Sequence, residues 1–313
     1  MPLHVIVGAG AVGSGTALRL AEAGHDIRLV TRSGHGPDHP GVERIAADAS
    51  DAARLTELAR GAHALYNCAN PPYHRWATEW PPLASSFLAA AEATEARLIT
   101  MSNLYGHARG TMPMRAGDPL APPTRKGAIR AAMWHDALRA HGEGRIRATE
   151  ARASDYVGPG LGDTSHLGDR TIPRVLAGKS VSLLGAADVI HSWSYIGDVC
   201  ATLATLGTDD RSLGRAWHVP TLPPVTARSM IDAIADAAAV PHVAVRRIPR
   251  PLLRAAGMFS PLVRELWEMR YQFDEPFVID ATDTTEVFGI QPTPLEHQVA
   301  EILHSYRSAV PSR

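Results

Sequence analysis

Residues 3–32 read as an apolar strand, a glycine-rich turn, an amphipathic helix and a second apolar strand, and they restrict the fold more than any other stretch. In a nucleotide-binding turn of this type, the first glycine allows the tight turn, the second lets backbone approach a pyrophosphate, and the third lets the helix pack close to the sheet. The start of the helix then offers unpaired N–H groups to the phosphates. The turn therefore predicts a dinucleotide site that contains Gly8, Gly10, Ala11, Val12 and Gly13.

The second strand ends with Arg32, where an NAD-specific unit would usually carry an acidic residue to hold the ribose 2′-hydroxyl. An arginine suits a 2′-phosphate instead, so the sequence favours NADP(H), with NAD(H) less favoured. The alternative is a solvated arginine at a strand end.

The rest of the N-terminal half alternates strands and helices, which is typical of a parallel sheet with crossover helices. Strands are predicted at 42–46, 63–67, 97–101 and 145–153, and helices at 51–60, 82–93 and 127–141. We expect an α/β fold with a Rossmann-type doubly wound parallel sheet and a smaller C-terminal substrate lobe. The dinucleotide-binding domain would span 1–160, with 186–220 returning to it, and the substrate-binding lobe would comprise 161–185 and 221–313.

Composition narrows the function classes. The 31 basic and 32 acidic residues nearly balance, so no nucleic-acid or anionic membrane partner is expected. The apolar runs are too short and too interrupted for a membrane span, and the chain starts directly in a strand, so no signal peptide is expected. Two cysteines, Cys68 and Cys200, are too few for a disulfide framework, and we expect a cytoplasmic protein. His35 and His39 lie in a segment rich in Gly and Pro, so no metal site is expected.

Five further segments follow one another in chain order: 66–70 (YNCAN), 101–106 (MSNLYG), 152–160 (RASDYVGPG), 195–199 (YIGDV) and 287–292 (VFGIQP). With the glycine turn, they resemble landmarks of the extended and atypical short-chain dehydrogenase/reductase superfamily, of the nucleotide-sugar epimerase/dehydratase type. The resemblance implies that Cys68, Ala69 and Asn70 line the ribose of the cofactor. It also implies that Asp48 contacts the adenine amino group, although Asp48 could equally be a residue at a helix N-terminus.

The catalytic motif of that superfamily is altered. Its Tyr-x-x-x-Lys should begin the helix that follows the loop 107–125, and these two positions are occupied here by Lys126 and Arg130. In the superfamily, the tyrosine transfers the hydroxyl proton and the lysine holds the nicotinamide ribose. Arginine can hold a ribose but is a poor proton shuttle, whereas a lysine beside another cation can act as an acid or base.

Positions i and i+4 share one helical face. We therefore expect both side chains to face the cofactor, with Lys126 orienting or protonating the substrate oxygen and Arg130 holding the ribose. The alternative for Lys126, one of only two lysines in the chain, is a solvated residue at the start of a helix.

The resemblance suggests further site residues. Tyr105 is a substitute proton donor, although the equivalent tyrosine is mostly structural in the superfamily, and Ser102 lies near the position that polarises the substrate. Substrate contacts are expected from Asn103, from His166 in the loop that follows Pro159, and from Glu268, Tyr271 and Gln272 in a helical segment that borders the cleft. The alternatives are a solvated loop histidine at 166 and an amphipathic helix at 261–273 that only packs the smaller lobe.

Three functions remain open. The leading hypothesis is an NADP(H)-dependent oxidoreductase that acts on a small organic substrate, such as a carbonyl or an activated alkene. The alternatives are an epimerase or dehydratase that retains its cofactor, and a non-catalytic NADP(H)-sensing regulatory protein. The helices at 82–93 and 127–141 could pair two subunits in a homodimer or simply cover the sheet.

Overall fold

A computed structural model describes residues 1–308, except for the side chains at 164, 256, 261 and 262. The last five residues of the predicted substrate lobe, 309–313, lie outside the described part. The centre of the molecule is a seven-stranded sheet in which every pairing is parallel. Its strand order is β12-β7-β5-β4-β1-β2-β3. The strands are β1 (Leu3–Val7), β2 (Asp26–Thr31), β3 (Val42–Ala46), β4 (Ala62–Asn67), β5 (Arg97–Asn103), β7 (Ala148–Ala153) and β12 (Ala216–His218).

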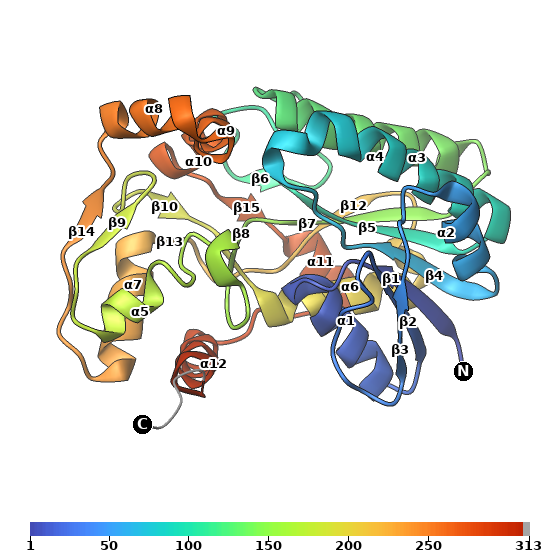
Figure 1. Cartoon of the computed structure of the whole chain (residues 1–313), viewed down its shortest axis with the longest axis horizontal. Coiled ribbons are helices and arrows are strands. Elements are labelled where there is room, and N and C mark those ends of the chain that lie inside the picture. The colour runs from blue at the N-terminus through green and yellow to red at the C-terminus, as the bar shows by residue number, and fades with distance from the viewer. Residues whose placement is uncertain (309–313) are drawn as a thin grey trace.

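Helices cover both faces of this sheet, as the strand–helix alternation predicted (Figure 1). One face carries α2 (Ala52–Ala59), α3 (Trp76–Thr94) and α4 (Arg125–Gly142). The other face carries α1 (Ala11–Glu22), α6 (Ile196–Thr208) and α11 (Thr282–Phe288). Because both faces are covered, strand β7 is buried along its whole length. The doubly wound α/β prediction is confirmed.

A second layer of short elements extends from one end of the sheet. It has its own hydrophobic core, to which α5, α7 and α12 contribute. The elements are β8 (Asp155–Val157), η2 (Gly162–Thr164), α5 (Ile172–Leu176), β9 (Val181–Leu183), β10 (Ile190–His191), β11 (Trp193–Tyr195), β13 (Val225–Thr226), α7 (Ala227–Ala238), β14 (Val245–Arg247) and α12 (Leu295–Ser308). The short helix η3 (Asp210–Ser212) instead packs against α6 beside the central sheet.

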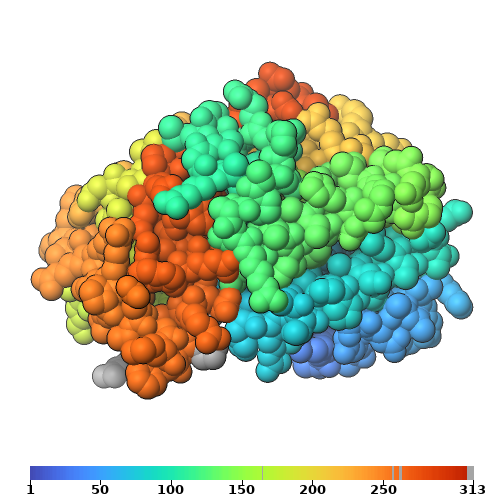
Figure 2. Space-filling model, turned by 90° about the horizontal axis from the view of Figure 1, so that it is seen from above, coloured from blue at the N-terminus to red at the C-terminus, as the bar shows by residue number. Residues whose placement is uncertain are grey.

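After β14 the chain turns back toward the start of α4 through α8 (Arg250–Phe259), α9 (Pro261–Met269) and α10 (Tyr271–Asp274). Strand β15 (Ile279–Asp280) pairs with β6 (Met114–Arg115) of the loop that precedes α4. In Figure 2 this returning segment, in orange, lies against that loop and the start of α4, in green. The two parts of the chain are therefore joined along one side of the molecule.

Helix α3 begins six residues earlier than the predicted start at residue 82. Pro81 and Pro82 lie inside it, and prolines usually mark a helix start because they lack an N–H group. Tertiary packing overrides that signal here, since Trp76 and Trp80 are 2% and 1% exposed on the core side of the extra turns. Because α3 starts earlier, the short helix η1 (Tyr73–Arg75) lies at the carboxyl ends of the parallel strands.

Within residues 1–308, no helix is long and apolar enough to cross a membrane. In the same part of the chain, no three histidine, cysteine or carboxylate side chains gather in a way that could hold a metal ion.

Candidate active site

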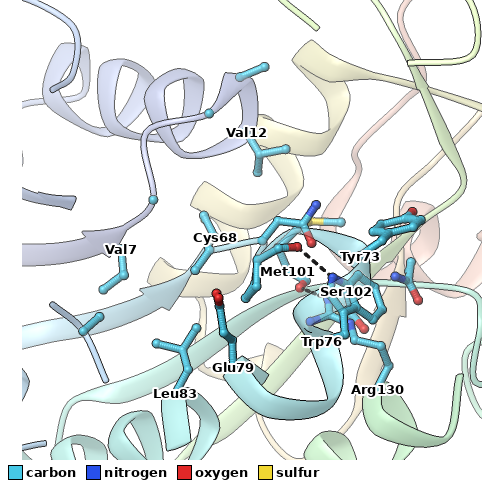
Figure 3. A pocket seen from close by; sticks show the side chains of 18 of the residues that line it. Val7, Val12, Cys68, Tyr73, Trp76, Glu79, Leu83, Met101, Ser102 and Arg130 are labelled. Carbon is cyan, nitrogen blue, oxygen red and sulfur yellow. Dashed lines mark hydrogen bonds between the residues drawn. The ribbon is translucent and has the colours of Figure 1, made fainter. Parts of the chain in front are cut away.

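A cavity of about 860 Å³ opens at the carboxyl edge of the parallel sheet, where the strand order reverses between β1 and β4. Ligands of doubly wound sheets bind at this switch point. The cavity runs from Arg32 and Asp48 at one end to Gln272 and Phe277, which the returning C-terminal segment contributes, at the other. Figure 3 shows its lining, with Val7, Val12 and Leu83 on one side and Tyr73, Trp76 and Arg130 on the other.

Each of the three glycines of the turn is needed for a different steric reason. Gly8 has a φ of +104°, and a Cβ there would lie 2.6 Å from the carbonyl oxygen of Cys68. A Cβ on Gly13 would lie only 1.8 Å from the Gly8 carbonyl oxygen. Gly10 has nothing within 4 Å of its Cβ position and lines the cavity. Two glycines therefore close the turn, and the third leaves room for a ligand.

The remaining predicted cofactor residues gather around this turn. The cavity is lined by Ala11, Val12, Arg32, Asp48, Cys68, Ala69 and Asn70 as well as by Gly8 and Gly10, whereas Gly13 packs behind the turn. The N-cap of α1 is Gly10, which has no side chain to cap the helix, so the N–H groups of the first turn stay available to an anion. This cradle fits the pyrophosphate of a dinucleotide.

Two charged side chains lie at the far end of the dinucleotide cradle. Arg32 is exposed, and no hydrogen bond or ion pair links it to another described residue. Asp48 accepts hydrogen bonds from the backbone N–H and the hydroxyl of Ser50, at 2.9 and 2.8 Å. These bonds, the backbone one first, lower the pKa of Asp48, and the charge of Arg32 adds to the effect. An acid and a free cation therefore face the same end of the cavity.

At the opposite end, Arg130 is 7% exposed and is fixed by three contacts. Its Nη2 donates to the Met101 carbonyl oxygen at 2.5 Å, and its guanidinium carbon lies 4.7 Å from the ring centre of Trp80 and 5.8 Å from that of Trp76. Burial lowers the pKa of Arg130. Its Nε and Nη1 atoms have no hydrogen-bond partner among the described residues. A buried cation in the cavity wall thus keeps unused donors.

Two phenols meet beside this arginine. The hydroxyl oxygens of Tyr73 and Tyr105 are 2.6 Å apart, and both residues line the cavity. Burial raises the pKa of Tyr73 to about 12, and burial also raises that of Tyr105 well above its usual range. The side chain of Gln272 hydrogen-bonds to Tyr105, while its Oε1 atom has no partner among the described residues.

Other polar groups complete this end. Ser102 is 4% exposed and lines the cavity, as does Asn103, whose side-chain oxygen accepts the Tyr105 N–H at 3.1 Å. Asp155 also lines it, and its carboxylate lies 2.9 Å from Nε2 of His191.

Lys126 lies elsewhere. It is 2% exposed, but its ammonium group binds the carboxylates of Glu265 and Glu268 on α9, the latter at 2.7 Å, and it is not among the residues that line the cavity. Lys126 is in the first turn of α4, and helical side chains point toward the N-terminus, so its long stem reaches past the helix end to α9. The expectation that Lys126 and Arg130 both face the cavity is therefore met only by Arg130.

Three of the predicted substrate contacts also lie outside the cavity lining. Glu268 binds Lys126 and accepts the Arg125 N–H at 2.5 Å. The His166 ring stacks on Phe273 with centroids 4.3 Å apart, and burial lowers its pKa to about 4. Tyr271 packs against Phe277.

The sequence analysis missed Tyr73, Trp76 and Asp155. A usable signal existed for Tyr73, because it follows Asn70 by three residues, and loops at the carboxyl ends of parallel strands carry ligand contacts. Asp155 lies within the segment 152–160, which was identified only as a landmark.

Comparisons with known proteins agree with this geometry. Residues 4–219 match the model of the NAD dependent epimerase/dehydratase family. A search of curated proteins gives no significant match.

Solved structures share the fold. The dTDP-glucose 4,6-dehydratase of Bacillus anthracis, in complex with NAD, is 16% identical, with a TM-score of 0.79 over 98% of this chain and 97% of that chain. The UDP-glucose 4-epimerase of Thermotoga maritima, with UDP-glucose, is 14% identical, with a TM-score of 0.79 over 99% of both chains. The UDP-glucuronic acid 4-epimerase of Bacillus cereus, in complex with NAD, is 13% identical, with a TM-score of 0.78 over 98% and 99%. Because the family model spans more than half of the sequence and covers every strand of the central sheet, this chain belongs to the NAD-dependent epimerase/dehydratase family and is an enzyme.

Proposed function

We propose that the protein is an oxidoreductase that transfers hydride between NADP(H) and a small organic substrate, such as a carbonyl or an activated alkene. The observation that carries this proposal is the single cavity that joins the open Gly10 turn to the hydroxyl and guanidinium groups of Ser102, Tyr105 and Arg130. A bound nicotinamide dinucleotide supplies or accepts the hydride. The side chains at the other end hold the substrate and move the proton.

The preference for NADP(H) rests on Arg32. Its guanidinium has no hydrogen-bond or ion-pair partner among the described residues and lies at the strand end where the ribose 2′ position of a dinucleotide is read. Two of the solved neighbours named above are in complex with NAD, so the proposed preference for NADP(H) depends on Arg32 of this chain alone. Replacement Arg32→Asp should weaken NADPH binding by roughly 1–3 kcal/mol, with a much smaller effect on NADH. Calorimetric titration of both cofactors tests it, and equal affinities in the wild type would contradict it.

We propose that Arg130 acts on the bound ligand chiefly through its charge. Its Nε and Nη1 atoms are buried, and the stack on Trp80 fixes the guanidinium group in the cavity wall. Lys126 acts from outside the cavity, because its ammonium group is held by two glutamates. We assign it to joining α4 to α9.

The charges of the lining also restrict the substrate. Among the described residues that line the cavity, the cations are Arg32, at the adenosine end, and Arg130, whose guanidinium is already engaged. Asp155 adds a carboxylate at the substrate end. A substrate with a diphosphate would meet this carboxylate with little compensating charge. We therefore propose an uncharged substrate, in contrast to the sugar nucleotide bound by the Thermotoga maritima epimerase.

A matched pair of aldehydes tests both statements. With NADPH, 4-nitrobenzaldehyde should be reduced, which is followed by the loss of near-ultraviolet absorbance of the reduced cofactor. The anionic 4-carboxybenzaldehyde should react with a lower kcat/KM, and Asp155→Asn should narrow this difference. Equal kcat/KM values for the two aldehydes would contradict the proposed charge selection.

The second candidate is an epimerase or dehydratase that retains its cofactor, and family membership favours it. Conversion of UDP-glucose without net loss of reduced cofactor would support that candidate. Tight binding of NADPH without turnover of any of these probes would instead support a sensing role.

A further inference from the structure

Tyr73 is the one phenol of the cavity that comes from the loop after β4. It begins η1, three residues beyond Asn70, so its backbone belongs to the same strand end that lines the cofactor cradle. Its ring packs edge-on against Trp76, with centroids 4.9 Å apart. Figure 3 shows Tyr73 at the same end of the cavity as Ser102 and Arg130.

Either hydroxyl can be the donor in the hydrogen bond between Tyr73 and Tyr105. The side chain of Gln272 acts on Tyr105 and lowers its pKa, which is the effect of a donor facing the Tyr105 oxygen. The arrangement that uses all three groups has Tyr105 donating to Tyr73. That bond lowers the pKa of Tyr73 against the effect of burial, and it raises the pKa of Tyr105 further. With its oxygen already accepting, Tyr73 has a hydrogen left for the cavity. In this arrangement the Tyr105 hydroxyl donates its hydrogen to Tyr73.

Charged groups of both signs lie near the same ring. The charge of Asp155 raises the pKa of Tyr73, and the charge of Arg130 lowers it to a smaller extent. The Lys126 ammonium nitrogen lies 5.8 Å from the centre of the Tyr73 ring, but Glu265 and Glu268 bind this ammonium group. A phenolate that forms on Tyr73 would be stabilised by the hydrogen bond with Tyr105 and by the charge of Arg130, which Met101 and Trp80 hold in place.

We propose that Tyr73 is the catalytic acid of this enzyme, donating its proton to the substrate oxygen, with Tyr105 as the positioning residue behind it. This proposal rests on the proposed oxidoreductase function. It assigns the proton transfer to a loop residue rather than to the first turn of α4, where Lys126 stands.

The step balances as a carbonyl reduction. The carbonyl carbon accepts a hydride from the reduced nicotinamide dinucleotide, the C=O π bond breaks, and the carbonyl oxygen takes the proton of Tyr73. A C–H and an O–H bond form, the cofactor is oxidised, and Tyr73 becomes a phenolate that the Tyr105 hydroxyl stabilises. Solvent water returns the proton after the alcohol leaves.

The first test needs no substrate. Ultraviolet difference titration of the NADP⁺ complex at rising pH follows the ionisation of tyrosines. Tyr73 should ionise before the other buried phenols, so Tyr73→Phe should remove the first buried-tyrosine transition. Tyr105→Phe should move that transition to higher pH, because it removes the donated hydrogen bond. Tyr306→Phe, on α12 and bonded to Asp169, is the matched control and should leave it in place.

The second test measures reduction of 4-nitrobenzaldehyde. Tyr73→Phe should lower kcat by about 100-fold or more and abolish the alkaline limb of the pH profile. Tyr105→Phe should cost about tenfold and move that limb to higher pH. The Kd for NADPH should stay within twofold in both variants. Retention of the first phenol transition, or of wild-type kcat, in Tyr73→Phe would overturn the assignment.

The two proposals fail separately. If the wild type does not turn over the aldehyde, the oxidoreductase function fails, and the titration still decides whether Tyr73 is the most acidic buried phenol. If the wild type turns over and Tyr73→Phe does so equally, only the assignment of Tyr73 fails.

Discussion

The dinucleotide end of the cavity is built mostly from backbone, and the opposite end mostly from side chains. Gly8, Gly10 and Gly13 shape the first end through what they lack, because each removes a Cβ that would strike backbone or occupy ligand space. The second end is shaped by side-chain contacts: Tyr73 hydrogen-bonds to Tyr105, and Arg130 bonds to the Met101 carbonyl oxygen and stacks on Trp80. The first end therefore depends on a few consecutive positions, whereas the second depends on contacts between distant parts of the chain. Four predictions examine this contrast.

The largest effect is expected at Gly13. Its Cβ would lie 1.8 Å from the Gly8 carbonyl oxygen, and backbone cannot move aside as a side-chain tip can. Gly13→Ala should destabilise the protein by more than about 3 kcal/mol or prevent folding. Urea unfolding followed by circular dichroism measures this. Gly10→Ala, with open space and a φ of −70°, is the control and should unfold like the wild type.

Gly10 should separate binding from folding. Gly10→Val places a branched side chain in the empty ligand space, so NADPH affinity should fall by at least about 100-fold. The free energy of unfolding should change by less than about 1 kcal/mol, because the only structural loss is a favoured glycine at the N-cap of α1. Calorimetric binding and thermal melting on the same sample give both values. Normal NADPH binding by this variant would show that the phosphate turn is assigned wrongly.

Outside the cavity, behind its second end, the ion pairs of Lys126 can be broken from either side. Lys126→Met leaves Glu265 and Glu268 facing each other, and their side chains are only 25% and 29% exposed. The free energy of unfolding should drop by about 2–3 kcal/mol, less than for a fully buried pair because water still reaches the glutamates. Adding Glu265→Gln and Glu268→Gln should restore much of the loss. A triple variant no more stable than the single one would refute this account.

The smallest effect is the loss of folding stability at low pH that His166 should cause. Burial holds the pKa of His166 at about 4, below its usual 6.5, so the folded protein keeps this ring neutral against Phe273. This contribution to stability is complete above pH 6.5 and is lost as the pH falls toward 4. It should amount to roughly 1–2 kcal/mol between pH 7 and pH 5. His166→Phe preserves the stack and should unfold with a flatter pH dependence. An unchanged slope would exclude His166 as its source.

The same contrast explains what the sequence could predict. The cofactor cradle was readable because its residues are neighbours in the chain and their spacing encodes the turn. The helix α4 was readable too, yet the direction of Lys126 was not, because Glu265 and Glu268 approach it only through the return of α9. Tyr73 was not predicted for a related reason. Pro81 and Pro82 suggested a later start for α3, so the segment before them was not identified as structured. Local patterns predicted the elements, and long-range partners determined the side chains.

The ion pairs between Lys126 and α9 also bear on the ancestry of this chain. A tyrosine at position 126, as the superfamily motif would have it, would leave the two glutamates without their cation. A return to that motif would need Lys126→Tyr and Arg130→Lys, and the first of these changes would weaken the junction of α4 and α9. The three positions are therefore expected to vary together among close homologues, with a neutral or basic α9 wherever a tyrosine begins α4.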